Sequence, residues 1–408
     1  MYTVTLDMLV FNYPKIFRVV SVCFTLFEDK VKIMEKQKGY DLPDDYRPFA
    51  DKYFLRSREI LEAYELNPWV NMQVFVRKGP GVIRGVDEAV EIVRKYSDIE
   101  AAGGKIYALK DGMPYGPKDT VMNIIAPIQE IIELETVYLG VIAAETTRFN
   151  DGIDIDLAQI EKNMRAVVEA AGDRPVMYFG ARHWRYDRDA EISEAAFRGG
   201  ASDCSTDIGA ATAGKKGLGT IPHALENIFA YYNGMENAVA LATEAFDEVI
   251  DPKVPRIALP DYANREITDS IATAKLLDGN LSGVRVDTPG ENIMEGGAPF
   301  DGRKYWTGTG VTIEGVYALR KELDRNGFED VKNVLTSGFG NVEKIRAFNR
   351  AEEELEIQLY DSLGVGGIFD ARMSTADIVA VGEDPSNMRE VHKVGRPARL
   401  NPLVRRVA

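Results

Sequence analysis

The sequence predicts an α/β protein in which an N-terminal α+β sandwich domain is followed by an α/β barrel. Two stretches of its 408 residues carry this prediction. In residues 51–150, helical and strand-like patterns follow one another without strict alternation, which favours a sandwich of mixed elements. From residue 151 onward, short apolar strands alternate with amphipathic helices, as in the repeated units of a parallel barrel. A composition of 45% hydrophobic and 28% charged residues is typical of a soluble globular protein.

The first 50 residues precede the predicted domains. Residues 8–27 are apolar, but a proline and two basic residues interrupt them, and no small-residue cleavage site follows. We therefore expect a soluble extension, or an upstream start chosen in error before Met34, over a membrane segment. Residues 35–50 are mostly polar and are expected to form a linker, so that residues 1–50 are an extension without a domain of their own.

Apolar spacing predicts the elements of the first domain. Residues 53–66 repeat apolar side chains at helical spacing, and residues 70–76 alternate as a half-buried strand does. Residues 373–408, beyond the barrel, are expected to pack back on this domain. The other predicted elements of the first domain are helices at 85–96 and 130–144 and strands at 105–111 and 120–125.

Helices and strands alternate in the predicted barrel, residues 151–372. A strand at 176–179 precedes a helix at 191–198, which ends at Gly199 and Gly200. The remaining predicted helices are 156–171, 224–232, 238–248, 265–277, 310–326 and 342–349, and the remaining strands are 256–259, 283–287, 332–337 and 366–369.

Charge and cysteine content narrow the classes of function. The net charge of −15 and the isoelectric point near 4.9 argue against binding to nucleic acid or to an anionic membrane. A small anionic substrate remains compatible, because local arginines can outweigh a distant, screened acidic surface. Two cysteines are too few for a disulfide framework or an all-cysteine zinc site, and three histidines argue against a histidine-rich metal centre. We therefore expect a cytoplasmic protein, and any metal should be a hard cation held by oxygen ligands.

Polar residues and glycines gather at the predicted strand ends, where parallel barrels carry their chemistry. Arginines and glycine-rich turns can bind phosphate, while carboxylates can hold Mg²⁺ or hydroxyl groups. Each motif alone is as readily a turn, a helix cap or a structural ion pair. Their joint position at the ends of one barrel favours a binding site. The set comprises Arg182 and His183; Ser202, Asp203, Ser205, Thr206 and Asp207; His223; Asp261; Arg285 and Asp287; residues 337–341; and residues 364–367.

At these residues the sequence resembles the nicotinate phosphoribosyltransferases, within the type II phosphoribosyltransferase group that also contains the quinolinate and nicotinamide enzymes. The resemblance covers about residue 51 to the C-terminus and implies that the barrel is an incomplete, TIM-like α/β barrel. The matching motifs, in order, are Asp51-Lys-Tyr-Phe-Leu-Arg-Ser-Arg58, Phe179-Gly-Ala-Arg-His183, Gly219-Thr-Ile-Pro-His-Ala-Leu225, Val284-Arg-Val-Asp-Thr-Pro-Gly290, Thr336-Ser-Gly-Phe-Gly-Asn341 and Gly364-Val-Gly-Gly367.

The family makes nicotinate mononucleotide and pyrophosphate from nicotinate and phosphoribosyl pyrophosphate, in NAD biosynthesis. The resemblance implies that Phe179 stacks on the pyridine ring and that Arg182 meets its carboxylate. Tyr53 of a neighbouring subunit would cover the opposite face, because the family builds its sites across a dimer interface. A homodimer or higher oligomer is therefore implied. The other residues implied on the base side are Arg56, Thr206 and Asp207.

The resemblance also implies the phosphate side of the site and its catalytic residues, His223, Arg285 and Asp287. Arg285 would contact phosphate and Asp287 would hold ribose hydroxyls, with Mg²⁺ bound to phosphoribosyl pyrophosphate. His223 matches the histidine that related enzymes phosphorylate with ATP, yet it could equally bind pyrophosphate, so ATP coupling stays open. The region around Asp261 departs from the Val-Asp-Thr pattern expected there, which leaves its role open. The residues implied around the terminal ribose phosphate are Ser337, Gly338, Gly340, Gly366 and Gly367.

Some relatives carry a four-cysteine zinc knuckle near the C-terminus. This sequence has no cysteine after Cys204, so we expect no zinc there.

Three alternatives stay open from the sequence. The quinolinate enzyme needs more cationic groups in its base pocket, which Arg185 and Arg188 could supply. Trp184 and the segment 219–223 favour nicotinate instead. A barrel that senses the nucleotide without turnover would keep the same fold. An aldolase-like barrel is disfavoured, because no lysine lies clearly at a predicted strand end to form a Schiff base.

Overall fold

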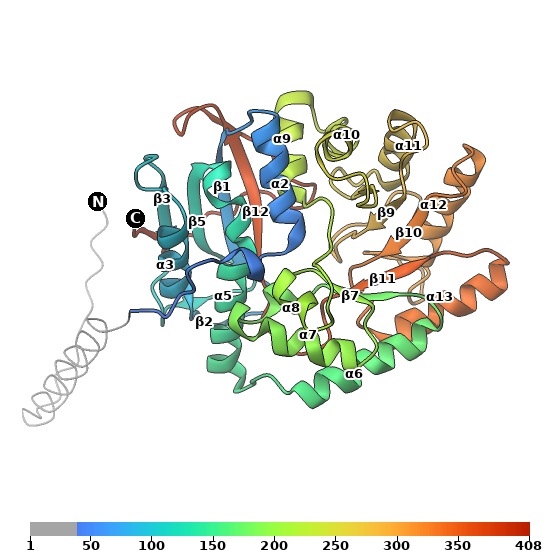
Figure 1. Cartoon of the computed structure of the whole chain (residues 1–408), viewed down its shortest axis with the longest axis horizontal. Coiled ribbons are helices and arrows are strands. Elements are labelled where there is room, and N and C mark those ends of the chain that lie inside the picture. The colour runs from blue at the N-terminus through green and yellow to red at the C-terminus, as the bar shows by residue number, and fades with distance from the viewer. Residues whose placement is uncertain (1–38) are drawn as a thin grey trace, which may run out of the picture. The chain divides into compact units, whose positions relative to one another are not determined.

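The computed structural model describes residues 39–408 and has a mixed α/β fold (Figure 1). One part is built on an antiparallel six-stranded sheet, and the other on a curled, parallel six-stranded sheet. The prediction of an α+β sandwich followed by an incomplete barrel is confirmed.

The antiparallel sheet has the strand order β13-β12-β1-β5-β3-β14. Its central strands, β1 (Trp69–Val76) and β5 (Thr120–Pro127), are apolar and mostly buried, which is why they lie inside the sheet. The other strands are β3 (Lys105–Ala108), β12 (Ser374–Gly382), β13 (Met388–Glu390) and β14 (Arg405–Arg406), and a separate pair is β2 (Gly81–Val82) with β4 (Pro114–Tyr115). The helical elements of this part are η1 (Arg47–Phe49), α2 (Lys52–Ala63), α3 (Val86–Tyr96), α4 (Ile128–Ile131), η2 (Ile132–Leu134) and α5 (Glu135–Asp151).

Strand β12 brings the C-terminal segment into the first sheet. It pairs antiparallel with β1, from Trp69 opposite Gly382 to Val76 opposite Ser374. Local patterns in the sequence did not predict this strand. Its return places β12 itself beside the barrel helix α9 (His223–Asn233), against which it packs (Figure 1).

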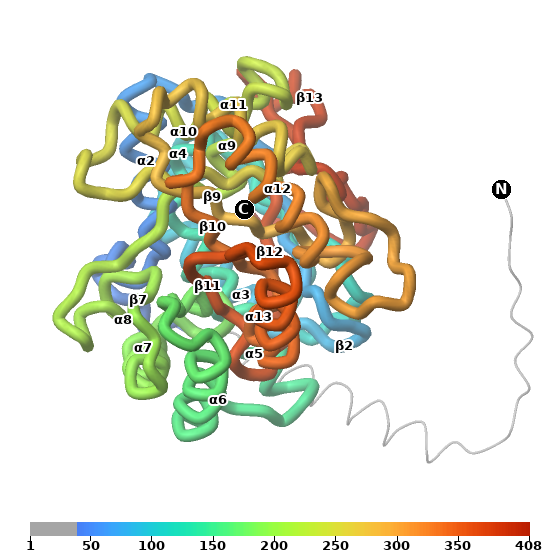
Figure 2. Tube along the Cα trace, turned by 90° about the vertical axis from the view of Figure 1, so that its right-hand side faces the viewer, coloured from blue at the N-terminus to red at the C-terminus, as the bar shows by residue number. Residues whose placement is uncertain are grey.

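The parallel sheet has the order β7-β6-β11-β10-β9-β8, and within residues 39–408 β7 and β8 are its edges, so the barrel is open. Helices α6, α7, α11, α12 and α13 lie around strands β9 to β11 (Figure 2). The strands are β6 (Val176–Tyr178), β7 (Asp203–Cys204), β8 (Ile257–Ala258), β9 (Gly283–Val286), β10 (Lys332–Leu335) and β11 (Ser362–Val365). The remaining helices are α6 (Leu157–Ala171), α7 (Asp189–Arg198), α8 (Asp207–Ala211), α10 (Ala238–Val249), α11 (Glu266–Leu276), α12 (Ile313–Arg325) and α13 (Val342–Leu355).

The last barrel strand begins earlier in the sequence than predicted. The expected strand at 366–369 is wrong, because β11 ends at Val365 and Gly366 and Gly367 follow it. Leu363 and Val365 are buried, and β11 pairs in parallel with β6 and β10. The two glycines are thereby left free to form a turn at the carboxyl end of the sheet.

A glycine allows the sandwich to approach the barrel closely. Gly140, on α5, lies against the loop after β6, and a Cβ atom on it would come 2.1 Å from the carbonyl oxygen of Trp184. Only a residue without a side chain fits this contact. The fully buried Trp184 and its neighbours are thereby fixed between the two parts of the fold.

The apolar residues 8–27 and the alternative start at Met34 lie outside the described residues. Among residues 39–408, none of the helices combines the length and the hydropathy that crossing a bilayer requires.

Candidate active site

A cavity of about 660 Å³ lies at the carboxyl ends of β6, β9, β10 and β11. Strand β12 and the first turn of α5, both from the sandwich, line its other side. This volume is in the range of small-molecule sites. The predicted site residues that line the cavity are Tyr53, Phe179, Arg182, His223, Arg285, Asp287, Ser337, Gly338, Gly340, Gly366 and Gly367.

Two aromatic rings and an arginine line the cavity. Phe179 directly follows β6, and its backbone N–H donates to the carbonyl of Val365 at 2.8 Å. Arg182 lies in the short helix η3 (Ala181–His183) that begins two residues later. Tyr53 comes from α2 of the same chain and donates its hydroxyl to Asp51 at 2.8 Å. The chain's own Tyr53 lines the cavity, and the expectation that Tyr53 of a neighbouring subunit covers the base stays a prediction.

Arg182 is joined to the sandwich through Glu135, at the start of α5. Its Nη1 donates to Oε1 of Glu135 at 2.8 Å, and the carboxyl side chain is only 5% exposed. Burial raises the pKa of Glu135 to about 8, although Arg182 acts to lower it. Near neutral pH the carboxyl is therefore mostly protonated, and the positive charge of Arg182 is available to another anion.

Two glycine-rich turns form the floor of the cavity. After β10 the chain turns through Ser337 and Gly338, which have φ values of 61° and 89°. Lys344, on α13, donates to the carbonyl of Ser337 at 3.0 Å and so supports this turn. The turn touches the one after β11 so closely that a Cβ atom on Gly340 would come 2.3 Å from the carbonyl oxygen of Gly367. Backbone N–H groups of such turns are suited to phosphate.

His183 supports the second glycine turn. Its Nδ1 lies 3.0 Å from the carbonyl oxygen of Gly366, so Nδ1 carries the hydrogen and donates it. Burial, reinforced by Arg182, lowers the pKa of His183 to about 4, and the ring is neutral at pH 7. This histidine is structural in the free protein, because it fixes the turn after β11.

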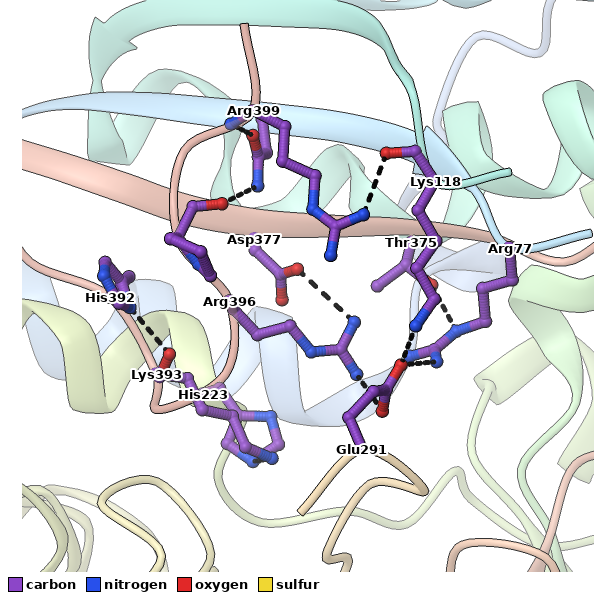
Figure 3. Close-up of polar contacts among 12 residues, drawn as sticks. Arg77, Lys118, His223, Glu291, Thr375, Asp377, His392, Lys393, Arg396 and Arg399 are labelled. Carbon is purple, nitrogen blue, oxygen red and sulfur yellow. Dashed lines mark hydrogen bonds and ion pairs between the residues drawn. The ribbon is translucent and has the colours of Figure 1, made fainter. Parts of the chain in front are cut away.

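His223 begins α9 and meets two charged residues from distant parts of the chain. Its Nε2 lies 2.8 Å from Oδ1 of Asp261, which is fully buried after β8. The Nζ of Lys393 lies 2.9 Å from the same nitrogen and donates to Oδ2 of Asp261. Figure 3 shows Lys393 beside His223. Lys393 belongs to the C-terminal segment and was not among the predicted site residues.

Arg285 and Asp287 lie side by side at the end of β9. Nη1 of Arg285 donates to Oδ2 of Asp287 at 3.3 Å, and Nη2 donates to the carbonyl of Ile221 at 3.2 Å. Both side chains remain partly exposed in the cavity. The arrangement presents a cation and a carboxylate to the same small space.

Two further arginines line the cavity and were missed by the sequence analysis. Arg77 follows β1, and Arg396 lies in the C-terminal segment. Both lie 3.7 Å from oxygens of Glu291, which also accepts from Lys118 (Figure 3). Despite partial burial, Lys118, Arg396 and Arg77 lower the pKa of Glu291 to about 2. Neither arginine follows a barrel strand, so neither carries the local pattern that marks the other residues of the cavity.

Three of the residues that the resemblance implied for substrate binding do not line the cavity. Thr206 caps α8 and donates to the buried carboxyl of Asp189. Asp207 accepts from Lys52 at 2.7 Å and from the N–H of Gly217. Arg56 donates to the carbonyl of Gly219. These three side chains therefore stabilise the loops around the site in this chain.

Arg185 and Arg188, which would supply extra cations under the quinolinate hypothesis, pair with carboxylates outside the cavity. Arg185 makes a paired contact with Glu88 at 2.9 Å, and Arg188 donates to Glu191. Neither lines the cavity.

Comparison with known proteins supports the observed architecture. The family model described as quinolinate phosphoribosyl transferase, N-terminal domain, matches residues 51–145. The crystal structure of nicotinate phosphoribosyltransferase from Porphyromonas gingivalis is similar with a TM-score of 0.60 at 12% identity, over 88% of this chain and 95% of that one. The nicotinate phosphoribosyltransferase from Vibrio cholerae has a TM-score of 0.58 at 12% identity, over 85% and 87% of the two chains.

The chain has the fold of the type II phosphoribosyltransferase group. In addition, the structure of a nicotinate-nucleotide pyrophosphorylase from Pyrococcus furiosus is 26% identical over 89% of this chain and 82% of that one, with a TM-score of 0.44. No curated protein matches the sequence. In this type II phosphoribosyltransferase fold, the matched sandwich domain supplies Tyr53, Arg77 and Glu135 to the cavity at the barrel ends.

Proposed function

We propose that this protein is a nicotinate phosphoribosyltransferase, which forms nicotinate mononucleotide and pyrophosphate from nicotinate and phosphoribosyl pyrophosphate. The observation that carries the proposal is a single cavity that joins the aromatic and arginine wall at Phe179 and Arg182 to the glycine turns after β10 and β11. A planar pyridine carboxylate and a ribose phosphate require these two surfaces together.

The base would bind between Phe179 and Tyr53, with its carboxylate toward Arg182. Aromatic faces suit a flat heterocycle, and a guanidinium matches a carboxylate with two parallel hydrogen bonds. The protonated state of Glu135 supports this role, because a neutral carboxyl competes less for Arg182 than an anion does. Ionised nicotinate already has a lone pair on its ring nitrogen, so the reaction needs no general base.

The ribose phosphate would lie against Ser337, Gly338, Gly340 and the turn after β11. Backbone N–H groups in glycine turns bind phosphate oxygens without needing a side chain. Helix α13 begins directly after the first turn, and its N-terminal dipole favours an anion there.

The leaving pyrophosphate would lie toward the cationic side of the cavity. In the reaction, the bond from the ribose anomeric carbon to pyrophosphate breaks while the bond to the pyridine nitrogen forms. Positive charge grows on the sugar and negative charge on pyrophosphate, so fixed charges of both signs are needed. Arg77, Arg396 and Arg285 would stabilise the pyrophosphate, and Asp287 would favour the sugar cation.

Mg²⁺ is expected to enter with phosphoribosyl pyrophosphate. In the part of the chain that the structure describes, no group of three or more His, Cys, Asp or Glu side chains is arranged to hold a metal ion. Mg²⁺ commonly takes only one or two carboxylates and completes its shell with substrate phosphates and water. Asp287 fits such a ligand, because its carboxylate is a quarter exposed in the cavity. Bound there, Mg²⁺ would supply charge neutralisation at the phosphate oxygens.

ATP coupling through His223 is the finer part of the proposal. His223 faces the cavity and belongs to the motif that suggested a phosphorylated histidine. A comparison of product yield with and without ATP tests this part separately from the main reaction.

Quinolinate phosphoribosyltransferase is the second candidate function. Arg77 and Arg396 favour it, because they add cations to the cavity that a second substrate carboxylate could use. The matched family model, that of the quinolinate enzyme's N-terminal domain, also favours it.

The deciding experiment compares substrates side by side. Purified protein is incubated with phosphoribosyl pyrophosphate, Mg²⁺ and either nicotinate or quinolinate, with and without ATP. We expect the mononucleotide from nicotinate alone. Product from quinolinate alone would make the second candidate correct. Tight nucleotide binding without any pyrophosphate release would indicate a sensing barrel instead.

A further inference from the structure

We propose that Lys393 is a positioning residue, which holds Asp261 against Nε2 of His223 and leaves Nδ1 of His223 as the nitrogen that acts on substrate. This inference rests on the proposed function only for the identity of the substrate. The arrangement of the three side chains stands by itself.

The hydrogen on His223 can be assigned from the contacts of Nε2. Asp261 lies 2.8 Å from this nitrogen, and a carboxylate can only accept a hydrogen bond. Although burial opposes ionisation, Lys393 and His223 hold the pKa of Asp261 well below its usual range, so the group is ionised. Nζ of Lys393 also lies 2.9 Å from Nε2 and can only donate, but the same ammonium donates to Oδ2 of Asp261. With the hydrogens of Lys393 directed to Oδ2, Nε2 carries the hydrogen of the imidazole and donates it to Oδ1. Within residues 39–408, no protein group hydrogen-bonds to Nδ1, which keeps its lone pair.

Lys393 is delivered to this position by a firmly anchored backbone. The N–H of Val394 donates to the carbonyl of Tyr262 at 3.0 Å, directly beside Asp261. Asn227, one turn after His223 on α9, donates to the carbonyls of Val391 and Ile378 at 3.2 and 2.9 Å. The segment is thus tied to the elements that carry both of its partners. The side chain of Lys393 is only 6% exposed, so its charge is poorly screened.

The charge of Lys393 bears on the protonation of His223. Burial lowers the pKa of His223, Lys393 lowers it further, and Asp261 and Asp287 act in the opposite direction. Glu226, on the next turn of α9, is fully buried, and burial raises its pKa well above the usual range, so it adds no charge. Without Lys393, the carboxylates would favour the imidazolium form, which has no free lone pair.

The first test is the tautomer of His223 in the unmodified protein. The chain has three histidines, so nitrogen-15 chemical shifts of labelled histidine side chains give a simple spectrum, and His223→Gln assigns the signal. Near pH 7.5 we expect a protonated Nε2 and a bare Nδ1 for His223. His183 is an internal control with the opposite tautomer, because its Nδ1 donates to Gly366. A bare Nε2 on His223 would overturn the proposal.

The second test is the effect of removing the charge. In Lys393→Met the pKa of His223 should rise by about one unit or more, since a nearby cation is lost and a carboxylate remains. Lys393→Arg should keep the low value. Lys332→Met is the matched control, because Lys332 is 60% exposed and pairs with Asp361 instead. If Lys393 only anchored the C-terminal segment, Lys393→Met would lower stability and leave the His223 pKa unchanged.

Activity then connects the arrangement to the reaction. In Lys393→Met, the acid limb of the pH profile of kcat/KM should move to higher pH by as much as the His223 pKa rises. In Lys393→Arg, the acid limb should stay where it lies in the unmodified protein. A shifted His223 pKa with no turnover in any variant would reject the proposed function and retain the role of Lys393. If Lys393→Met turns over substrate with the acid limb of its kcat/KM profile and its His223 pKa both unchanged, the role of Lys393 is rejected and the proposed function is retained.

Discussion

Arg182 and Glu135 meet at 2.8 Å across the boundary between the barrel and the sandwich. Arg182 follows β6, while Glu135 begins α5, so this contact links the strand end that carries the base pocket to the other part of the fold. Because burial raises the pKa of Glu135 to about 8, the pair changes character within the physiological pH range.

Arg182→Ala should mainly weaken the use of nicotinate. A hydrogen bond to a charged group is worth enough that KM for nicotinate should rise roughly 10- to 100-fold, with a smaller change in KM for phosphoribosyl pyrophosphate. Steady-state kinetics with each substrate varied in turn measures this. Arg188→Ala is the control, because Arg188 pairs with Glu191 outside the cavity. Equal effects on both substrates would argue against a base-side role.

Glu135 should make nicotinate binding depend on pH. Above about pH 8 its carboxylate forms and competes for Arg182, so KM for nicotinate should rise with pH, and Glu135→Gln should remove that rise.

The free energy of unfolding should also depend on the protonation of Glu135. Its pKa is raised from 4.5 to about 8, so the folded state keeps a proton that the unfolded chain releases, and stability is lost as pH rises through this window. Urea unfolding of the unmodified protein and of Glu135→Gln between pH 4.5 and about pH 8 measures whether the free energy of unfolding falls as pH rises.

The glycine turns offer a matched pair of substitutions. Gly340→Ala places a methyl group against the carbonyl of Gly367 and should destabilise the fold by roughly 1–3 kcal/mol. A Cβ atom on Gly367 meets nothing within 4 Å, so Gly367→Ala should keep normal stability. If phosphate lies against this turn, Gly367→Ala should still raise KM for phosphoribosyl pyrophosphate. Denaturation and kinetics on the two variants separate these effects, and equal stability losses would contradict the described contact.

The barrel side of the site could be predicted from sequence because its signals are local. Phe179, Arg182, Arg285 and the glycine turns each follow an apolar strand within a few residues, and the parallel sheet brings the strand ends together. The predicted boundary of β11 was wrong for two reasons. Gly364 lies inside the strand, and the apolar residues after the glycine turn have the pattern of a strand.

The sandwich side could not be predicted in this way. Arg77, Lys393 and Arg396 reach the cavity because β12 pairs with β1 and carries the C-terminal segment back across the site. That pairing joins segments from opposite ends of the chain, and no local periodicity reports it. Thr206 and Asp207 show the opposite case. Their local pattern suits a strand end, but in this structure their side chains form a helix cap and an ion pair.

Removing an arginine beside Glu291 and removing the charge of Glu291 should change KM for phosphoribosyl pyrophosphate in opposite directions. Arg77→Met and Arg396→Met should each raise KM for phosphoribosyl pyrophosphate roughly tenfold, since each removes a charged partner of the pyrophosphate. Glu291→Gln should lower that KM, because the internal anion that occupies these cations is lost. Arg346→Met, at an exposed pair with Glu343, is the control. A rise in KM for Glu291→Gln would show that Glu291 orients the arginines more than it competes with substrate.

The product that the purified protein forms from nicotinate, phosphoribosyl pyrophosphate and Mg²⁺ is the most direct test of the proposed function. We predict that mass spectrometry detects nicotinate mononucleotide, together with one pyrophosphate for each nicotinate consumed, and that Arg182→Ala slows its formation at low nicotinate concentration. A folded protein that yields no mononucleotide from nicotinate, with or without ATP, would contradict the central claim.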